Sequence, residues 1–207
     1  SMEGTLAPLA DILELSQKYG ALVYIDDAHG VGVLGERGRG TLEHLGLKSQ
    51  ENVIEMGTFG KAFGTFGAFI TAEKLVIELI GQKARSFIYT TALPPAIAAA
   101  TVEAIEIVDS EPKRREKLNT NARKLREGLK SFSTPEAESH IVPVILGKAE
   151  KATGLSKKLY DMGYFAHSIR PPTVPRGRSM LRITAMSEHT DADIDGLIEA
   201  ISMNIDE

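Results

Sequence analysis

The sequence predicts an α/β protein, because helical and strand-like segments alternate along its 207 residues. A short apolar run, Ala21–Ile25, is followed at once by Asp26-Asp27. Such a run is typical of a strand that is buried on both faces of a parallel sheet. A glycine-rich segment follows this strand and another follows the next one, at the edge where open α/β sheets place their ligands.

In the first half of the chain, segments with a helical pattern of apolar residues alternate with short strand-like apolar runs. Leu6, Leu9 and Ile12 fall near one helical face, and Gly20 supplies a C-terminal stop. The expected elements are a helix at 6–19, strands at 21–25, 52–56 and 67–71, and helices at about 72–84 and 94–109.

From Ser110 the chain becomes more strongly charged. The expected elements are a charged helix from 111 to about 130, a strand at 141–146, a helix at about 150–162, strands near Phe165 and at 181–184, and a helix from Asp191. Pro171, Pro172 and Pro175 require an extended or turning chain. We place a domain boundary near residue 106, which gives one domain at 1–105 and a second at 106–207.

Composition excludes several classes of protein. The net charge is −4 and the pI is about 5.8, whereas a nucleic-acid-binding surface is basic. No apolar run approaches the roughly 20 residues that span a bilayer. The chain has no cysteine, which excludes disulfides and thiolate metal sites and suits the cytoplasm. The five histidines do not have the spacing of a zinc site, so we expect no metal.

Gly30, Gly32 and Gly35 match the G-x-G-x-x-G spacing of dinucleotide-binding proteins, and Glu55 lies 20 residues beyond them. That site needs a helix N-terminus directly behind the glycines to hold the pyrophosphate. Here the sequence continues with Glu36–Gly40, whose glycines and alternating charges oppose a helix. An NAD-dependent dehydrogenase remains an alternative from another class.

Lys61 is the only charged residue between Met56 and Ala72. Its neighbours are small or aromatic, and desolvation among them would lower the pKa of the amine. A neutral amine is what Schiff-base chemistry requires. The alternative is a lysine that extends from an apolar turn into solvent.

Asp26 and His29 follow the predicted strand at 21–25. A carboxylate at such a position can keep a heterocyclic nitrogen protonated, and the histidine can reach another edge of the same ring. A strand-end aspartate together with a glycine-flanked lysine is the pair that pyridoxal phosphate needs.

At these residues the chain resembles the α-oxoamine synthases, a branch of the fold-type-I pyridoxal-phosphate enzymes. The matching stretches are Ser1–Leu9, Ile25–Gly40, Gly57–Gly64, Tyr89–Pro95, Ile169–Pro175 and Leu181–Thr184. The resemblance implies part of the large pyridoxal-phosphate-binding domain, with a mostly parallel sheet, followed by the small C-terminal α/β domain. It also implies that family members carry a further N-terminal portion that is absent here.

The resemblance implies a role for individual residues. Lys61 would bind the cofactor and move the α-proton of the substrate, Asp26 would pair with the pyridinium nitrogen, and His29 would bond to the ring oxygen. The other implied contacts are Ser1 with the cofactor, Thr58 with its phosphate, Thr90 and Thr91 with the phosphate across a homodimer, Arg182 with the amino-acid carboxylate, and Arg170 and Thr173 with the acyl thioester.

The activity implied is the decarboxylative condensation of an amino acid with an acyl thioester. The motifs favour the branch that uses L-alanine and a pimeloyl thioester, carried by coenzyme A or a carrier protein, in biotin biosynthesis. Glycine C-acetyltransferase and 5-aminolevulinate synthase are the alternatives within the family.

Overall fold

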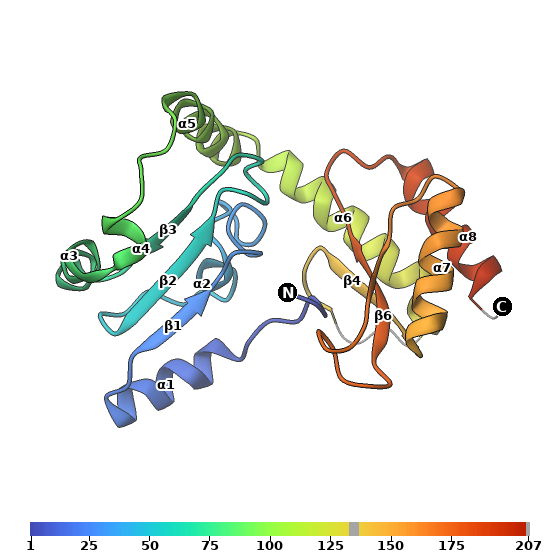
Figure 1. Cartoon of the computed structure of the whole chain (residues 1–207), viewed down its shortest axis with the longest axis horizontal. Helices are drawn as coiled ribbons and strands as arrows, with labels where there is room; N and C mark the ends of the chain where they lie inside the picture. Colours follow the sequence, from blue (N-terminus) through green and yellow to red (C-terminus); the bar gives the residue numbers. More distant parts are fainter. Residues whose placement is uncertain (133–136, 206–207) are drawn as a thin grey trace. The chain divides into compact units, whose positions relative to one another are not determined.

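The computed structural model describes residues 1–132 and 137–205. Within them the chain forms two compact units, each built around its own three-stranded sheet (Figure 1). One unit is Ala7–Pro112, and the other combines Ser1–Leu6 with Lys113–Glu207. This division falls a few residues after position 106 and assigns the first six residues to the C-terminal unit.

The unit Ala7–Pro112 carries a mixed sheet. Its elements are α1 (Leu9–Tyr19), β1 (Val23–Asp26), α2 (Thr41–His44), β2 (Val53–Thr58), β3 (Ala68–Thr71), α3 (Lys74–Lys83), α4 (Arg85–Ile88) and α5 (Pro95–Ser110). The strand order is β1-β2-β3. Val23 pairs with Val53 in parallel, and Thr58 pairs with Ala68 in antiparallel.

Helix α1 covers one face of this sheet. Its apolar side packs into a core formed by Leu9, Leu13, Ile25, Leu42 and Val53. The helix ends at Gly20, whose φ of 61° is left-handed and therefore suits glycine.

The expected burial of the first strand on both faces is wrong. Ile25 is buried, whereas its neighbour Tyr24 is 59% exposed. Successive side chains of a strand point to opposite faces, and the α1 core covers only the face that carries Ile25.

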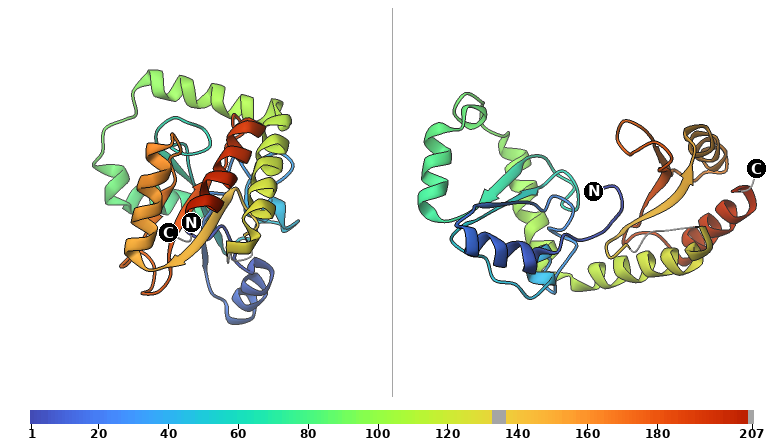
Figure 2. Two further views of the ribbon diagram at one scale, coloured as in Figure 1. Left: turned by 90° about the vertical axis from the view of Figure 1, so that its right-hand side faces the viewer. Right: turned by 90° about the horizontal axis from the view of Figure 1, so that it is seen from below.

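The C-terminal unit carries an antiparallel sheet. Its elements are α6 (Pro112–Gly128), the 3₁₀ turn η1 (Lys130–Phe132), β4 (Ile141–Gly147), α7 (Ala149–Asp161), β5 (His167–Ile169), β6 (Ser179–Thr184) and α8 (Asp191–Asn204). The strand order is β4-β6-β5. Figure 2 shows α6, α7 and α8 to one side of this sheet. Leu125, Leu159, Leu181 and Ile201 are fully buried there.

The strand expected near Phe165 begins two residues later, at His167. Phe165 itself is 81% exposed and precedes the strand. Ala166 is buried instead, and its backbone carbonyl accepts a 2.6 Å hydrogen bond from Ser156 Oγ of α7.

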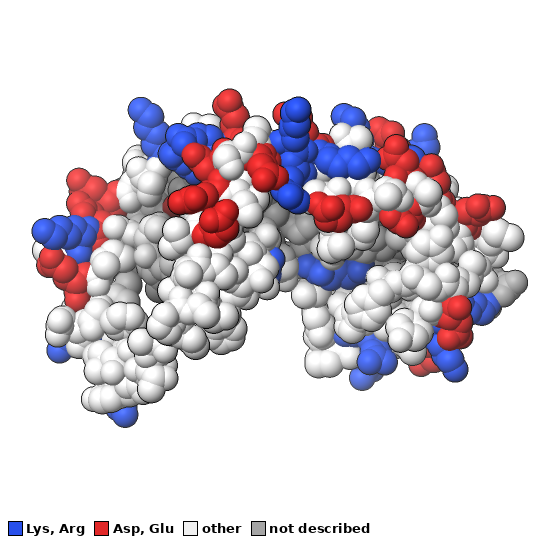
Figure 3. Space-filling model, turned by 90° about the horizontal axis from the view of Figure 1, so that it is seen from above, with Lys and Arg blue, Asp and Glu red and all other residues white. Residues whose placement is uncertain are grey.

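Acidic and basic side chains are interspersed on the face of the molecule drawn in Figure 3. Exposed side chains of opposite charge also form ion pairs, such as Arg37–Asp109 and Lys117–Asp191. No helix among the described residues is both long and apolar enough to cross a membrane.

Candidate active site

The carboxyl ends of β1 and β2 lie at one edge of the first sheet. The two strands run parallel, and Asp26, the last residue of β1, pairs with Met56 of β2. The next amide, Asp27 N, donates to Met56 O at 2.9 Å. Thr58 ends β2 two residues beyond Met56, so the predicted ring-nitrogen partner and the predicted phosphate ligand follow neighbouring strands at the same edge.

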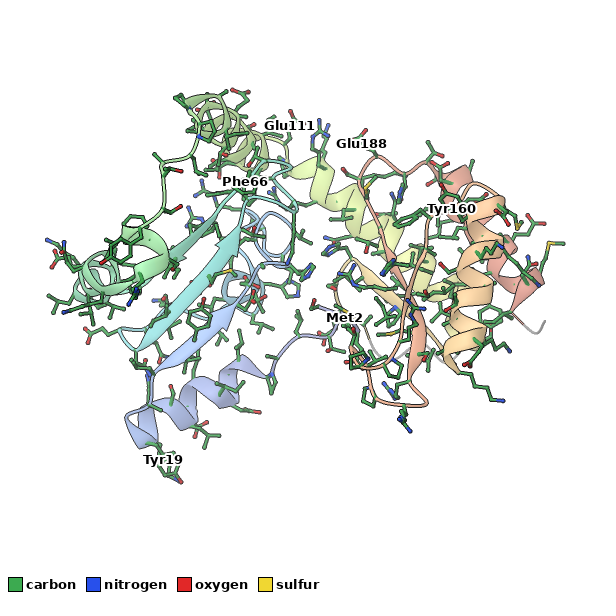
Figure 4. All side chains as sticks on the ribbon, in the orientation of Figure 1. Met2, Tyr19, Phe66, Glu111, Tyr160 and Glu188 are labelled. Atoms are coloured by element: carbon green, nitrogen blue, oxygen red, sulfur yellow. The ribbon has the colours of Figure 1, made fainter. Side chains whose placement is uncertain are left out.

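Lys61 lies in a tight turn between β2 and β3, which Phe66 marks in Figure 4. Phe59 N donates to Gly67 O, and Thr65 N donates to Phe59 O, both at 2.9 Å. Within the turn, Gly64 N donates to Lys61 O at 3.0 Å. The backbone on both sides of the lysine is therefore held by hydrogen bonds.

The hydroxyl of Thr58 closes the base of this turn. It donates to Gly67 O at 3.0 Å and accepts from Gly60 N at 3.2 Å. The threonine thus connects the end of β2 to the backbone just before Lys61.

The desolvation expected around Lys61 is not supplied by the described residues, since the side chain is exposed. The aromatic neighbours pack on one another instead of around the amine. Phe59 lies 5.5 Å from Phe63 and 4.9 Å from Phe69, measured between ring centroids. In this chain Lys61 therefore fits the alternative interpretation, in which the lysine extends from an apolar turn into solvent.

Asp26 is the last residue of β1, and His29 lies in the turn that follows this strand. The Asp26 side chain is exposed, and its Oδ1 accepts a 3.1 Å hydrogen bond from Ala28 N. His29 is half-buried. The structure therefore brings Asp26, His29, Thr58 and Lys61 to the loops at one edge of one sheet, and we call these four residues the strand-edge group.

Thr90 and Thr91 lie outside the strand-edge group, on the exposed connection between α4 and α5. Thr90 Oγ1 donates to Thr91 O at 3.4 Å. Both hydroxyl groups are accessible to another molecule.

Arg182 lies on β6 in the C-terminal unit, where its guanidinium is held by two hydrogen bonds. Nε donates to Ser1 O at 2.8 Å, and Nη1 donates to Thr184 Oγ1 at 3.0 Å. Partial burial lowers the pKa of this guanidinium from its ordinary value. Ser1 and Arg182, both predicted from the resemblance, are therefore neighbours in the structure.

Arg170 and Thr173 lie in an exposed turn of the same unit. Thr173 N donates to Arg170 O at 3.1 Å. The flanking residues Ile169 and Val174 are buried in a cluster with Met180, which anchors both ends of the turn.

Asp27 makes contacts that the sequence did not lead us to expect. The residue is only 5% exposed, and its carboxylate accepts hydrogen bonds from Thr41 N, at 2.7 Å, and from the Thr41 hydroxyl. Burial raises the pKa of Asp27, the two hydrogen bonds from Thr41 oppose that rise, and the charge of Asp26 adds to it. The available signal was the alternation of the strand, which turns adjacent aspartates to opposite faces.

A pocket of about 840 Å³ lies beside Asp27 in the same unit. Its walls include Glu55, Phe63, Phe69 and Ile105. Glu55 is half-buried, and burial, with a smaller contribution from the charge of Asp27, raises the pKa of its carboxyl.

The dinucleotide interpretation of Gly30, Gly32 and Gly35 is wrong. Turns follow Gly35, and the next helix, α2, begins only at Thr41 and has four residues. The structure therefore lacks a helix N-terminus directly behind the glycines, which a pyrophosphate requires.

Comparison with known proteins identifies the family. Residues 1–201 match the family Aminotransferase class I and II. The chain belongs to this family. An 8-amino-7-oxononanoate synthase from Methylococcus capsulatus is 45% identical over 204 residues, which are 98% of this chain and 53% of that protein.

Two solved structures extend the comparison. A structure of SPT (serine palmitoyltransferase) with a PLP internal aldimine has a TM-score of 0.92 at 34% identity, over 99% of this chain and 52% of that one. The 8-amino-7-oxononanoate synthase of Francisella tularensis has a TM-score of 0.82 at 28% identity, over 94% of this chain and 58% of that one. The chain thus spans about half the length of the relatives it matches.

These comparisons confirm the predicted α/β fold class and the resemblance to pyridoxal-phosphate enzymes of fold type I. The strand-edge group also fits the cofactor chemically. It offers an amine for an aldehyde, a carboxylate for a ring nitrogen, and a hydroxyl with turn amides for a phosphate. A side chain built at Gly60 or Gly64 would meet little or nothing, so the turn that carries Lys61 leaves open space beside its backbone.

Proposed function

We propose that this chain is part of a pyridoxal-phosphate-dependent 8-amino-7-oxononanoate synthase. The enzyme condenses L-alanine with a pimeloyl thioester and releases carbon dioxide, as in biotin biosynthesis. The observation that carries the proposal is that Asp26, at the end of β1, and Lys61, after the end of β2, lie at the same edge of one sheet, in a chain 45% identical to a protein of that name.

Pyridoxal phosphate supplies an electron sink for the carbanion formed at the α-carbon of the amino acid. The strand-edge group would hold it. Asp26 would keep the ring nitrogen protonated, His29 would donate to the ring oxygen, and Thr58 would bind the phosphate. Lys61 would hold the cofactor through its amine, and the same amine would move the α-proton of the substrate.

Arg182 would orient the substrate by binding its carboxylate through two parallel hydrogen bonds, a geometry that suits a guanidinium. Its bonds to Ser1 O and Thr184 Oγ1 fix the plane of the group. We assign a cofactor contact to Ser1 and the binding of the acyl thioester to Arg170 and Thr173.

The overall reaction balances with these residues. A bond forms between the α-carbon of alanine and the carbonyl carbon of the thioester, and the carbon–sulfur bond breaks to release a thiol. The alanine carboxyl leaves as carbon dioxide, and a proton returns to the α-carbon. We further propose a cytoplasmic homodimer, in which Thr90 and Thr91 of one subunit bind the cofactor phosphate of the other.

A second substrate pair comes from the structural comparison. The SPT structure matches this chain with a higher TM-score than the Francisella tularensis synthase does, which favours L-serine with palmitoyl-CoA as the competing pair. Glycine with acetyl-CoA and glycine with succinyl-CoA represent the other two activities in the family.

The test uses the full-length enzyme that contains this sequence, loaded with pyridoxal phosphate. Each amino acid is supplied with each thioester, and product and released thiol are quantified. We expect kcat/KM to be highest for L-alanine with a pimeloyl thioester, and turnover to vanish in Lys61→Ala but not in Lys151→Ala, which changes an exposed lysine on α7. A preference for another pair would overturn the substrate assignment, and turnover by Lys61→Ala would overturn the role of the lysine.

A further inference from the structure

The glycine-rich loop 28–40 wraps around two carboxylates of its own chain. Asp27, at the start of the loop, accepts both hydrogen bonds from Thr41, at its end. Glu43, two residues further on, accepts from Arg39 N at 2.9 Å and from Arg37 N at 3.3 Å. The loop thus encloses internal anions in place of a bound phosphate.

Three glycines of the loop leave room for these carboxylates, because a side chain at any of them would occupy the same space. A Cβ added at Gly30 or at Gly40 would overlap the carboxylate of Asp27. A Cβ added at Gly35 would overlap the carboxylate of Glu43. Gly40 has a φ of 103° and Gly35 a φ of 85°, which side chains also disfavour.

The same loop touches the turn that carries Lys61. Gly32 packs so closely that an added Cβ would lie 2.7 Å from Ala62 Cβ, next to the lysine, and 3.4 Å from Phe63 Cε2. Gly32 N donates to Gly38 O at 2.8 Å, which ties this contact point to the far side of the loop. The loop therefore connects the turn after β1 with the turn after β2.

We propose that Asp27 is a positioning residue: by closing the loop 28–40 on Thr41, its carboxylate holds His29 and Asp26 in place and supports the Lys61 turn through Gly32. The inference rests on the proposed function, because the residues held in place are those assigned to the cofactor.

The contribution of the Asp27 side chain to the loop is its two hydrogen bonds with Thr41. Asp27 and Thr41 are both buried, so water does not readily replace either partner. Asparagine can preserve the arrangement, since its oxygen accepts from Thr41 N while its amide donates to the Thr41 hydroxyl oxygen. Alanine removes both bonds and leaves the Thr41 amide without an acceptor.

The experiment compares matched variants of the full-length enzyme. Asp27→Ala removes both hydrogen bonds of the closure and Asp27→Asn keeps them. Thr41→Val removes only the bond from the hydroxyl and Thr41→Ser keeps it, since the bond from the Thr41 backbone N–H is present in both. Asn52→Ala is the control, because it removes two hydrogen bonds of similar length in the same unit, to Ser16 Oγ at 3.0 Å and Ala21 O at 2.8 Å, away from the loop.

Three quantities are measured: hydrogen exchange of the peptide 28–41, the dissociation constant of pyridoxal phosphate from its visible absorbance, and kcat. In Asp27→Ala and Thr41→Val we expect faster exchange, weaker cofactor binding and a loss of kcat of about 10- to 100-fold, since a displacement of about 1 Å can cost that much. Asp27→Asn and Thr41→Ser should give hydrogen exchange, cofactor binding and kcat close to those of the wild type. Asn52→Ala should change only stability.

Equal effects of Asp27→Ala and Asn52→Ala on cofactor binding and kcat would overturn the inference in favour of a purely structural role. So would an Asp27→Asn variant as impaired as Asp27→Ala, because charge would then matter more than the hydrogen bonds. If Asp27→Ala does not fold, the Thr41 pair decides. If the wild type forms no visible band, the proposed function fails, while the exchange of peptide 28–41 still decides whether Asp27 closes the loop.

Discussion

Replacing Gly32 by alanine tests whether the loop 28–40 sets the position of Lys61, the lysine to which we assign the cofactor. Gly32 has a φ of 81°, and its added methyl group would lie 2.7 Å from Ala62 Cβ. This is about 0.8 Å closer than the optimum separation of roughly 3.5 Å between carbon atoms. The Lys61 turn, the loop or both must therefore move by several tenths of an ångström.

A matched control separates this displacement from backbone strain. Gly20 has a φ of 61°, and nothing lies within 4 Å of a Cβ added there. Both substitutions place alanine in the left-handed region, at a cost of roughly 1–2 kcal/mol. Gly32→Ala adds overpacking of about 1–3 kcal/mol and a displacement next to Lys61.

The assay combines urea unfolding with steady-state kinetics on the full-length enzyme. We expect Gly20→Ala to lose about 1–2 kcal/mol of unfolding free energy with kcat unchanged. We expect Gly32→Ala to lose more stability and also about 10- to 100-fold in kcat, because a small displacement of a reacting group is costly. Equal kcat values for the two variants would refute the proposed contact between the loop and the lysine turn.

Three further predictions concern stability. Leu125→Ala, at a fully buried position of α6, should lower the unfolding free energy by about 2–5 kcal/mol in urea titrations; a loss below 1 kcal/mol would contradict the packing described. Burial raises the pKa of Glu55 above its ordinary 4.5, so the folded state holds this proton more tightly and the stabilisation is lost as pH rises through the raised pKa. Glu55→Gln should therefore gain stability relative to wild type as the pH rises from about 4.5 through the raised pKa. Parallel curves of unfolding free energy against pH for the two proteins would exclude this cause. Asp109→Asn breaks an ion pair whose side chains are 53% and 56% exposed and should cost less than about 1 kcal/mol, with a larger thermal-melt effect counting against it.

The elements predicted from periodicity and end signals agree with the structure to within a few residues. Gly20 ends α1 as expected, and Asp191 begins α8, where Thr190 forms a capping box with Asp193. These signals are local, since a helix end depends on the residues within one turn of it. The fold class followed because the order of local elements restricts the architecture.

The surroundings of individual side chains could not be predicted in the same way. Tyr24 and Lys61 sit among apolar neighbours in the sequence, yet both are exposed. Burial depends on which elements cover each face, and the α1 core covers only one face around β1. The aromatic residues around Lys61 pack against each other, and this packing cannot be predicted from the composition of the segment.

The glycine motif shows why one sequence pattern can serve two purposes. Glycines are selected wherever backbone must approach an anion closely, and the pattern does not say whether that anion is a ligand or a side chain of the same protein. Here the buried carboxylate of Asp27 comes one residue after the strand, and its acceptors are taken by Thr41. A pyrophosphate in the same loop would face that carboxylate at short range, so the internal anion that explains Gly30 and Gly40 also excludes the dinucleotide. The discriminating signal is thus an acid at the end of a strand together with a hydroxyl residue that directly follows the last glycine, and both can be read from the sequence once the alternation of the strand is followed past its end.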